Sequence, residues 1–179
     1  TLLHILGGVD KPTSGHVYVE GSDVFSLNEN NLAIFRRRQV GLIYQFYNLI
    51  PILNVTENIS LPMMLDGKEP DKNYLMELIK TLGLEKRVNH LPNELSGGQQ
   101  QRVSIGRALI YHPSLVLADE PTGNLDSKSS HEIMELLEIS NKKYGQTIIM
   151  ITHDENLAMH ASRIITIEDG RIIRDEKVG

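Results

Sequence analysis

Short, continuous runs of apolar residues mark the C-terminal third of the chain. Leu115–Ala118 is wholly apolar, and Thr147–Ile151 is apolar after its first residue. Runs of this kind are typical of parallel strands that are buried on both faces of a sheet. We therefore predict two buried strands here.

The residues between these two runs have the periodicity of a helix. Ile133, Leu136 and Leu137 fall on one face of a helix that is expected from about residue 128 to residue 143. Gly145 is the kind of residue at which such a helix ends. A strand, a helix and a second strand of these lengths predict a right-handed βαβ unit, and hence the α/β class.

Weaker strand signals lie on both sides of this unit. Near the N-terminus they are a short signal at His16–Glu20 and an apolar run at Val40–Tyr44. Near the C-terminus, Ile164–Ile167 and Arg171–Ile173 are separated by a turn-like Asp-Gly pair and predict a hairpin. The first residues, 1–6, are apolar and helix-like, with two glycines as a stop signal.

The middle of the chain is different, because from about Phe46 to His112 it has helical character and no strand-like run. The clearest helix has apolar residues at positions i, i+3, i+4 and i+7, with Asp71 as a cap before it and Gly83 after it. Those apolar residues are Leu75, Leu78, Ile79 and Leu82. We predict one domain over residues 1–179, with a mostly parallel α/β core at 1–45 and 113–179 and an inserted helical subdomain at 46–112.

Composition narrows the function classes. The net charge of −5 argues against a general nucleic-acid-binding surface, and the basic run Arg36–Arg38 is interpreted as a solvated helix end. The chain has no cysteine, which excludes disulfides and thiolate metal sites. No apolar stretch reaches the roughly 20 residues that a membrane-spanning helix needs, and the N-terminus lacks the features of a signal peptide. We expect a cytoplasmic location.

Polar residues follow three of the predicted strands, at the points where those strands end. Asp119 and Glu120 follow one buried strand, His153 follows the next, and Gln45 follows the strand at 40–44. A single polar residue after a strand is common and needs no function, since strands end at the surface. In α/β sheets, however, ligands bind beyond the carboxyl ends of the parallel strands, so the four together predict a site at one sheet edge.

A second chemical signal is the string Leu95–Arg102, which precedes an apolar helix face. Ser96 and Gln99 match a capping box, which accounts for part of the string without any ligand. It does not account for Gly97 and Gly98, since glycine is unfavourable in a helix. Bare backbone N–H groups at the positive end of a helix dipole favour an anion, so we predict a phosphate site here. The residues of the apolar face are Ile105, Ala108 and Leu109.

These motifs resemble those of ABC ATPases, in the order found in that family. Leu95–Arg102 is similar to the signature motif, and Leu115–Glu120 to the Walker B strand with its following glutamate. Gly123–Asp126 resembles the D-loop, Gln45 the Q-loop glutamine and His153 the switch histidine. The resemblance covers the whole chain and implies a P-loop NTPase fold, with ATP and Mg²⁺ as ligands.

Two local features resemble the corresponding segments of one subgroup of the family. This subgroup consists of the ATPase subunits of lipoprotein-release, macrolide-export and bacitracin-resistance systems. The two features are the segment Tyr44–Pro51 and the Gly-Asn-Leu-Asp form of the D-loop. The resemblance implies an ATPase that powers an exporter or extractor. Its partners would be transmembrane permease subunits and a second, head-to-tail ATPase subunit, and it would lie on the inner face of the cell membrane. The alternatives are a non-transport ABC ATPase of translation or DNA repair and a catalytically impaired binding fragment.

The resemblance also implies roles for single residues. Glu120 would be the general base and His153 a γ-phosphate donor that holds this base in line, while Asp119 and Gln45 would hold Mg²⁺. From its position before a proline, Glu120 is expected to have extended backbone angles. The same resemblance implies six residues that contact ATP or lie at the dimer interface where ATP is bound. They are Thr1, Ser96, Gly97, Gly98, Gln99 and Asp126.

One family motif is not in the sequence, namely the Walker A loop with its glycines, lysine and serine. By the resemblance it would come directly before Thr1, where Thr1–Leu3 is similar to the start of the helix that follows the loop. This loop supplies most of the contacts to the β- and γ-phosphates. We therefore expect the chain as given to be inactive, and to bind ATP more weakly than a chain that carries the loop.

Overall fold

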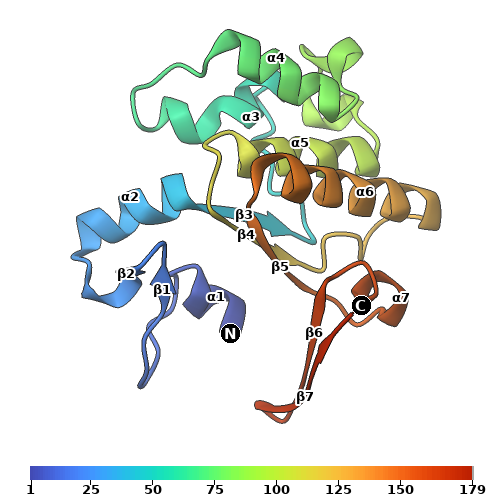
Figure 1. The fold of residues 1–179 in the computed structure, drawn as a ribbon. Helices are drawn as coiled ribbons and strands as arrows, with labels where there is room; N and C mark the ends of the chain where they lie inside the picture. The colour runs from blue at the N-terminus through green and yellow to red at the C-terminus, as the bar shows by residue number, and fades with distance from the viewer. Residues whose placement is uncertain (179) are drawn as a thin grey trace.

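The computed structural model describes residues 1–178, and its parts are labelled in Figure 1. Three short 3₁₀ helices, at Val24–Ser26, Glu85–Arg87 and Pro92–Glu94, accompany the main elements. In chain order the main elements are α1 (Leu2–Leu6), β1 (Tyr18–Val19), β2 (Ser22–Asp23), α2 (Glu29–Gln39), β3 (Val40–Tyr44), α3 (Val55–Met64), α4 (Lys72–Thr81), α5 (Gly97–Leu109), β4 (Leu115–Asp119), α6 (Ser127–Tyr144), β5 (Thr147–Ile151), α7 (Glu155–Ala158), β6 (Arg163–Glu168) and β7 (Arg171–Lys177).

The central sheet has the strand order β3-β4-β5, and all of its pairings are parallel. β3 and β5 have the bounds that the apolar runs predict, and β4 is one residue longer. The helix between β4 and β5 is α6, so the predicted βαβ unit is present. The two-stranded antiparallel sheets β1-β2 and β6-β7 complete a mixed α/β fold.

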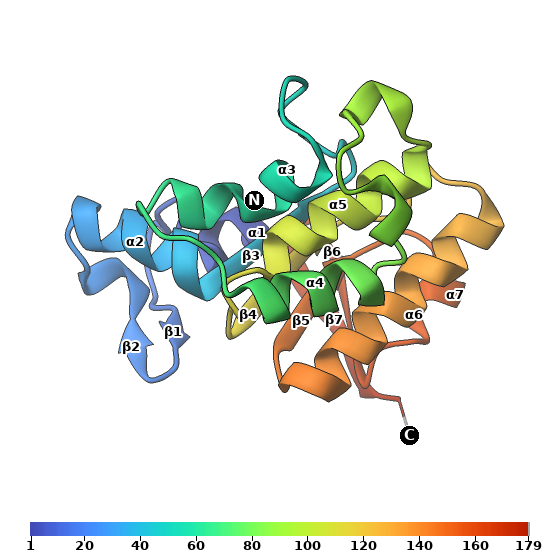
Figure 2. The same cartoon turned by 90° about the horizontal axis from the view of Figure 1, so that it is seen from above.

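Between β3 and β4, the described residues form helices and loops with no strand. Figures 1 and 2 show α3 and α4 on the outer side of α5, away from the sheet. α4 begins where the sequence predicts, because the carboxylate of Asp71 accepts a hydrogen bond of 2.8 Å from the N–H of Tyr74. It ends before Gly83, whose φ of +66° is a conformation that glycine adopts readily.

The sheet separates two apolar clusters, and β4 contributes alternate residues to each. Val116 and Ala118 join the larger cluster with α3, α4, α5 and α6. Leu115 and Leu117 join the smaller one on the other face, with α1 and α2. This alternation is the period of two that a strand imposes on its side chains.

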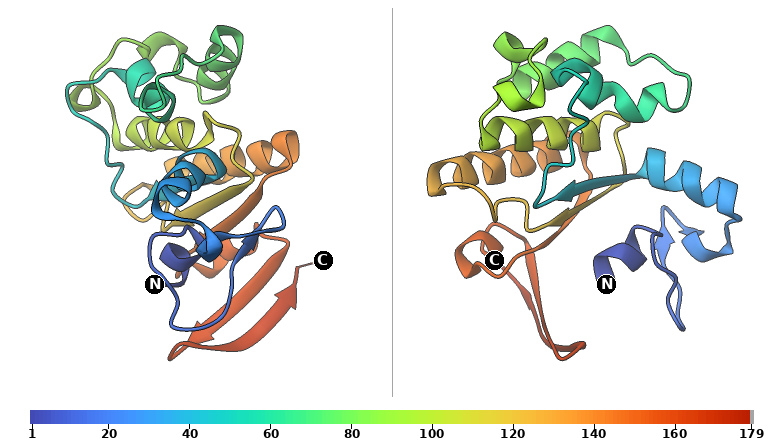
Figure 3. Two further views of the ribbon diagram at one scale, coloured as in Figure 1. Left: turned by 90° about the vertical axis from the view of Figure 1, so that its left-hand side faces the viewer. Right: turned by 180° about the vertical axis from the view of Figure 1, so that it is seen from behind.

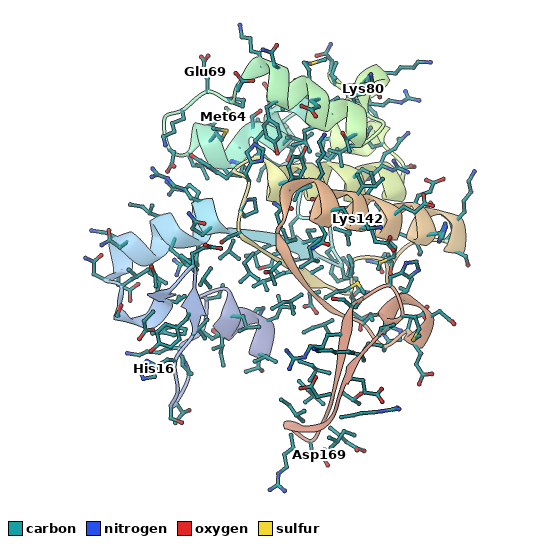
Figure 4. All side chains as sticks on the ribbon, viewed as in Figure 1. His16, Met64, Glu69, Lys80, Lys142 and Asp169 are labelled. Carbon is teal, nitrogen blue, oxygen red and sulfur yellow. The ribbon has the colours of Figure 1, made fainter. Side chains whose placement is uncertain are left out.

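β5 differs from the prediction, because it is a half-exposed strand rather than a buried one. Both of its end residues are exposed, and Ile151 retains 40% of its accessible surface. Within residues 1–178, β5 pairs only with β4 and therefore forms an edge of the sheet. The β6–β7 hairpin is still more exposed: it projects from the body in Figure 3, and Figure 4 shows Asp169 at its tip.

The arginine run at the end of α2 is also different from the prediction, because it is paired rather than solvated. Arg37 and Arg38 both form ion pairs with Asp66, whose side chain is only 3% exposed. The hydroxyl of Tyr111 donates to the same carboxylate at 2.5 Å. These donors, Tyr111 first, hold the pKa of Asp66 well below its usual range. The run therefore joins α2 to the segment that follows α3.

The methionines of α3 divide between the core and the surface. Met63 packs against the larger apolar cluster, as expected for a core residue. Met64 is 50% exposed, so core packing does not account for it, and Figure 4 shows it at the edge of the helical region. No helix within residues 1–178 combines the length and apolar character that crossing a membrane requires.

Candidate active site

The ends of the three parallel strands lie side by side. Tyr44, Asp119 and Ile151 are register partners across the sheet, so the residues after them emerge at one edge. At this edge His153 Nδ1 lies 2.7 Å from Glu120 Oε1. The convergence predicted from the sequence is therefore present for these two residues, which are 33 positions apart in the chain.

The backbone of Glu120 is not extended, although a proline follows it. Its φ is +46°, in the left-handed region that non-glycine residues seldom occupy. Two backbone hydrogen bonds hold it there. Its N–H donates to the carbonyl of Ile151 at 3.0 Å, and its carbonyl accepts from the N–H of Gly123 at 3.1 Å. The prediction from Pro121 was wrong because these tertiary and turn contacts outweigh the local preference.

Glu120 also sets the electrostatics of His153. The hydrogen bond that the imidazole donates to Glu120, followed by the charge of Glu120, raises the pKa of His153 above its usual value. The His153 side chain is 80% exposed, whereas that of Glu120 is 27% exposed. The imidazole is therefore held by one side-chain contact and is free to meet a ligand from the solvent.

Gln45 lies against the segment Gly123–Asn124, which follows Glu120. Its Nε2 donates to Asn124 Oδ1 at 3.3 Å, and Asn124 Nδ2 donates back to the carbonyl of Gln45 at 3.0 Å. A Cβ on Gly123 would lie 2.8 Å from Gln45 Nε2, so this contact requires glycine there. The pairing joins the strand end of β3 to the D-loop-like segment.

The start of α5 has the geometry predicted for Ser96 and Gln99. Ser96 N–H donates to Gln99 Oε1 at 3.0 Å, and Gln99 N–H donates to Ser96 Oγ at 3.3 Å, which completes a capping box. The glycines, however, also have a packing role. A Cβ on Gly97 would lie 2.8 Å from the Tyr47 hydroxyl, and one on Gly98 would lie 3.2 Å from Ser129 Oγ. A side chain at position 97 would therefore require the Tyr47 hydroxyl to move, with or without a phosphate.

Two further predicted site residues are helix caps. Asp126 caps α6: its carboxylate accepts from the N–H groups of Lys128 and Ser129 at 3.1 and 3.0 Å and from Ser129 Oγ at 2.7 Å. These bonds, those from Ser129 first, lower the pKa of Asp126. Thr1 is the N-cap residue of α1 but makes no side-chain capping bond. Neither the capping bonds of Asp126 nor the position of Thr1 by itself indicates a nucleotide site.

The residues beside Glu120 suit a magnesium ion that arrives with a nucleotide. Within residues 1–178 there is no group of three or more histidine or acidic residues that could hold a metal alone. Mg²⁺ is usually held by one or two protein oxygen ligands together with substrate phosphates and water. Asp119 at the end of β4 and the amide oxygen of Gln45 supply oxygen ligands of that kind.

An open cleft of about 480 Å³ lies beside the Glu120–His153 pair. It is bounded by the D-loop-like segment, the first turns of α6 and the start of α7. Its polar lining leaves room for a water molecule or a phosphate group next to the carboxylate. The lining includes Glu120, Thr122, Ser127, His131, His153 and His160.

Three further residues hold this site together and could not be singled out from the sequence. Asn124 lies in a string that was noted only as a motif. Gln101 and Arg107 lie on α5, where only the apolar face was considered. Arg107 donates to the backbone carbonyls of Tyr47 and Asn48, at 2.9 and 2.6 Å, and so holds the loop after Gln45. For Gln101 and Asn124 the one available signal is their place inside the motifs Leu95–Arg102 and Gly123–Asp126, whereas Arg107 lies outside every motif. The partners of all three residues lie far away in the sequence.

Comparisons with known proteins identify the family of this chain. The profile of the family described as ABC transporter matches residues 1–123. The uncharacterized ABC transporter ATP-binding protein MJ1508 of Methanocaldococcus jannaschii is 51% identical over 97% of this chain and 78% of its own length. The lipoprotein-releasing system ATP-binding protein LolD of Geobacter metallireducens is 47% identical over 98% of this chain and 79% of its own length.

A solved structure has the same fold. It is the dimeric, post-hydrolysis state of the ATP-binding cassette MJ0796 bound to ADP and Pi, which is 41% identical and has a TM-score of 0.87. The match covers 99% of this chain and 79% of the solved one. With the family profile and these relatives, the strand ends, the signature string and the Glu120–His153 pair have one common explanation. The chain belongs to the ABC transporter family, as an ATP-hydrolysing subunit.

Proposed function

We propose that Glu120 and His153 are the hydrolytic pair of this ATPase, that Asp119 and Gln45 hold Mg²⁺, and that the protein drives an exporter or extractor. The observation that carries the catalytic part is the 2.7 Å contact between Glu120 and His153 at adjoining strand ends. A carboxylate held this way beside an open cleft can orient a water molecule and accept its proton.

The reaction is the transfer of the γ-phosphoryl group of ATP to water. The water oxygen bonds to the γ-phosphorus, the bond to the bridging oxygen of ADP breaks, and Glu120 accepts the proton of the water. His153 donates a hydrogen bond to the γ-phosphate oxygens, where charge is concentrated, and its contact with Glu120 keeps the two groups in line. When bound, Mg²⁺ would neutralise phosphate charge, and Asp119 and Gln45 would hold it through their side-chain oxygens.

The proposed partners rest on the relatives. The MJ0796 cassette is a dimer in its solved structures, which supports a second ATPase subunit, arranged head to tail, for this chain. In that arrangement Ser96, Gly97 and Gly98 bind the nucleotide of the other subunit. The 47% identity to a lipoprotein-releasing system protein supports membrane permease partners and an exporter or extractor, with the subunit on the inner face of the membrane.

The experiment is a Glu120→Gln substitution in the protein with the family's phosphate-binding loop upstream of Thr1. Glutamine keeps the shape and the hydrogen bond to His153 but cannot accept the proton. Turnover should fall by about 10²–10⁴-fold while ATP binding is preserved. The matched control is Glu138→Gln, because Glu138 also holds a histidine, at 2.6 Å, but lies outside the strand ends. Steady-state turnover of Glu120→Gln near the wild-type value would remove Glu120 from its role.

A further inference from the structure

Gln101 is a fully buried amide on α5 that lies directly beneath the site. Its side chain is 0% exposed, and its Nε2 donates to the carbonyl of Pro121 at 2.6 Å and to the carbonyl of Tyr44 at 3.3 Å. Tyr44 is the residue before Gln45, and Pro121 is the residue after Glu120. One side chain therefore contacts both strand ends, next to two residues of the proposed site.

The direction of these bonds indicates what the amide does. A glutamine NH₂ group has two donors, and here both are directed to main-chain carbonyls. Gln101 Oε1 accepts no hydrogen bond from any residue in the described part of the chain. An unpaired buried acceptor is unfavourable, so this orientation is retained for the contacts of its donors.

Gln101 contacts the backbone beside Glu120, whose φ of +46° is in the left-handed region. A non-glycine residue with positive φ persists only where its surroundings over-determine it. Glu120 has backbone bonds to Ile151 and Gly123, and Gln101 adds a third restraint at Pro121. The restraint comes from the same helix that begins with the signature glycines.

Neighbouring glutamines on α5 do not make this connection. Gln99 belongs to the capping box, and Gln100 Nε2 donates to the nearby carbonyl of Leu95 at 3.2 Å. Gln101 alone of these three donates to residues far away in the sequence, at separations of 57 and 20 positions. It therefore joins the signature helix to the ends of β3 and β4.

We propose that Gln101 is a positioning residue that sets the backbone at Glu120 and Gln45 and so couples the signature helix to hydrolysis. This inference rests on the proposed roles of Glu120 and Gln45. Because Gln101 is itself a residue of α5, a displacement of this helix directly changes its hydrogen bonds to Pro121 and Tyr44. Gln101 acts through the backbone and does not touch the nucleotide.

The test is Gln101→Met, which keeps the side-chain volume and removes the donors, in the protein with the phosphate-binding loop. The kcat for ATP hydrolysis should fall by about 10²-fold, as for small misplacements of catalytic groups, whereas KM for ATP changes far less. The control is Ser104→Ala, one turn further along α5. Ser104 is also 0% exposed and its hydroxyl is unpartnered, so removing it should leave kcat unchanged.

A second measurement does not depend on activity. The amide of Gly123 donates to the carbonyl of Glu120, so its hydrogen exchange reports on this turn. We expect exchange about 10-fold faster in Gln101→Met than in wild type or Ser104→Ala. If the methionine variant does not fold, Gln101→Asn keeps the amide but is one methylene too short, and the same changes are expected.

Unchanged kcat and unchanged exchange at Gly123 in a folded Gln101 variant would overturn the inference. Equal losses in kcat and ATP binding would also overturn it, since they indicate general destabilisation. The proposed function fails separately, through Glu120→Gln. If that variant is inactive while Gln101→Met is fully active, only the role of Gln101 is wrong.

Discussion

Two neighbouring strands, β4 and β5, have similar apolar sequences and very different surroundings. Four residues of β4, Leu115–Ala118, are buried, and alternate ones join the two apolar clusters. β5 contacts both clusters only through partly buried residues, and both of its ends are exposed. Since the two runs look alike in the sequence, the difference arises from position within residues 1–178: β4 pairs with a strand on each side, and β5 pairs on one side.

The same difference continues into the site beyond the strands. Glu120 follows the buried strand, and its main chain is held by backbone bonds on both sides. His153 follows the half-exposed strand. Its ring contacts Glu120 at 2.7 Å, and 80% of its side chain is accessible. The fold therefore fixes the backbone of Glu120 more firmly than the ring of His153.

The largest expected effect on stability is that of truncating a buried residue of β4. Leu117 on β4 is 0% exposed, and a Cβ on Gly7 would already lie 3.1 Å from its Cδ1, so its pocket is closely packed. Leu117→Ala should lower the free energy of unfolding by about 2–5 kcal/mol, the range for a buried leucine that leaves a cavity. Urea denaturation measures this loss, and a loss under about 1 kcal/mol would contradict the closed packing around β4.

The next effect concerns His153 and is kinetic. In the protein with the phosphate-binding loop, His153→Ala should lower kcat by about 10²-fold, because the proposed hydrogen bond to the transferring phosphate matters most in the transition state. ATP affinity, measured by calorimetry, should change much less. His131→Ala is the control, since His131 lines the same cleft but pairs with Glu135. Equal losses of binding and turnover would instead indicate a structural histidine.

A smaller effect is expected at Ile149, the register partner of Leu117 on β5. Ile149 is only partly buried against the smaller cluster, so less apolar area and less packing are lost on truncation. Ile149→Ala should lower the free energy of unfolding by about 1–2 kcal/mol. A loss as large as that of Leu117→Ala, in the same urea experiment, would show that β5 is as well covered as β4.

The smallest effect is the pH dependence of the Glu120–His153 contact. The pKa of His153 is raised in the folded protein, so the pair stabilises the fold fully below the unfolded value of about 6.5. This contribution is lost as the pH rises through the folded pKa. The stability difference between wild type and His153→Gln, from thermal midpoints, should therefore shrink from pH 6 upward. A difference that grows over this window would give the opposite sign for the pKa shift.

Much of the fold and of the site could be predicted because it depends on local chemistry. The apolar runs located β3, β4 and β5, and the caps at Asp71 and Ser96 located the starts of α4 and α5. The residues after the strands were found for a similar reason, since parallel strands deliver their carboxyl ends to one edge.

Other features depend on partners far away in the sequence and could not be predicted. Arg37 and Arg38 looked like a solvated run until the fold brought the buried Asp66 to them. The close approach of Gly97 to the Tyr47 hydroxyl joins the start of α5 to a loop far away in the sequence. Neither contact leaves a pattern in the local sequence.

The sequence by itself therefore determined the three strands of the central sheet, the helix α6, the α/β class and the identity of the residues at the strand ends. Tertiary structure alone decided that β4 is covered and β5 is not, that Glu120 has a left-handed backbone, and that Gln101 lies beneath it. The physical reason is the range of the forces involved. Hydrophobic periodicity and capping act within a few residues, whereas burial and buried hydrogen bonds depend on which segments the folded chain brings together.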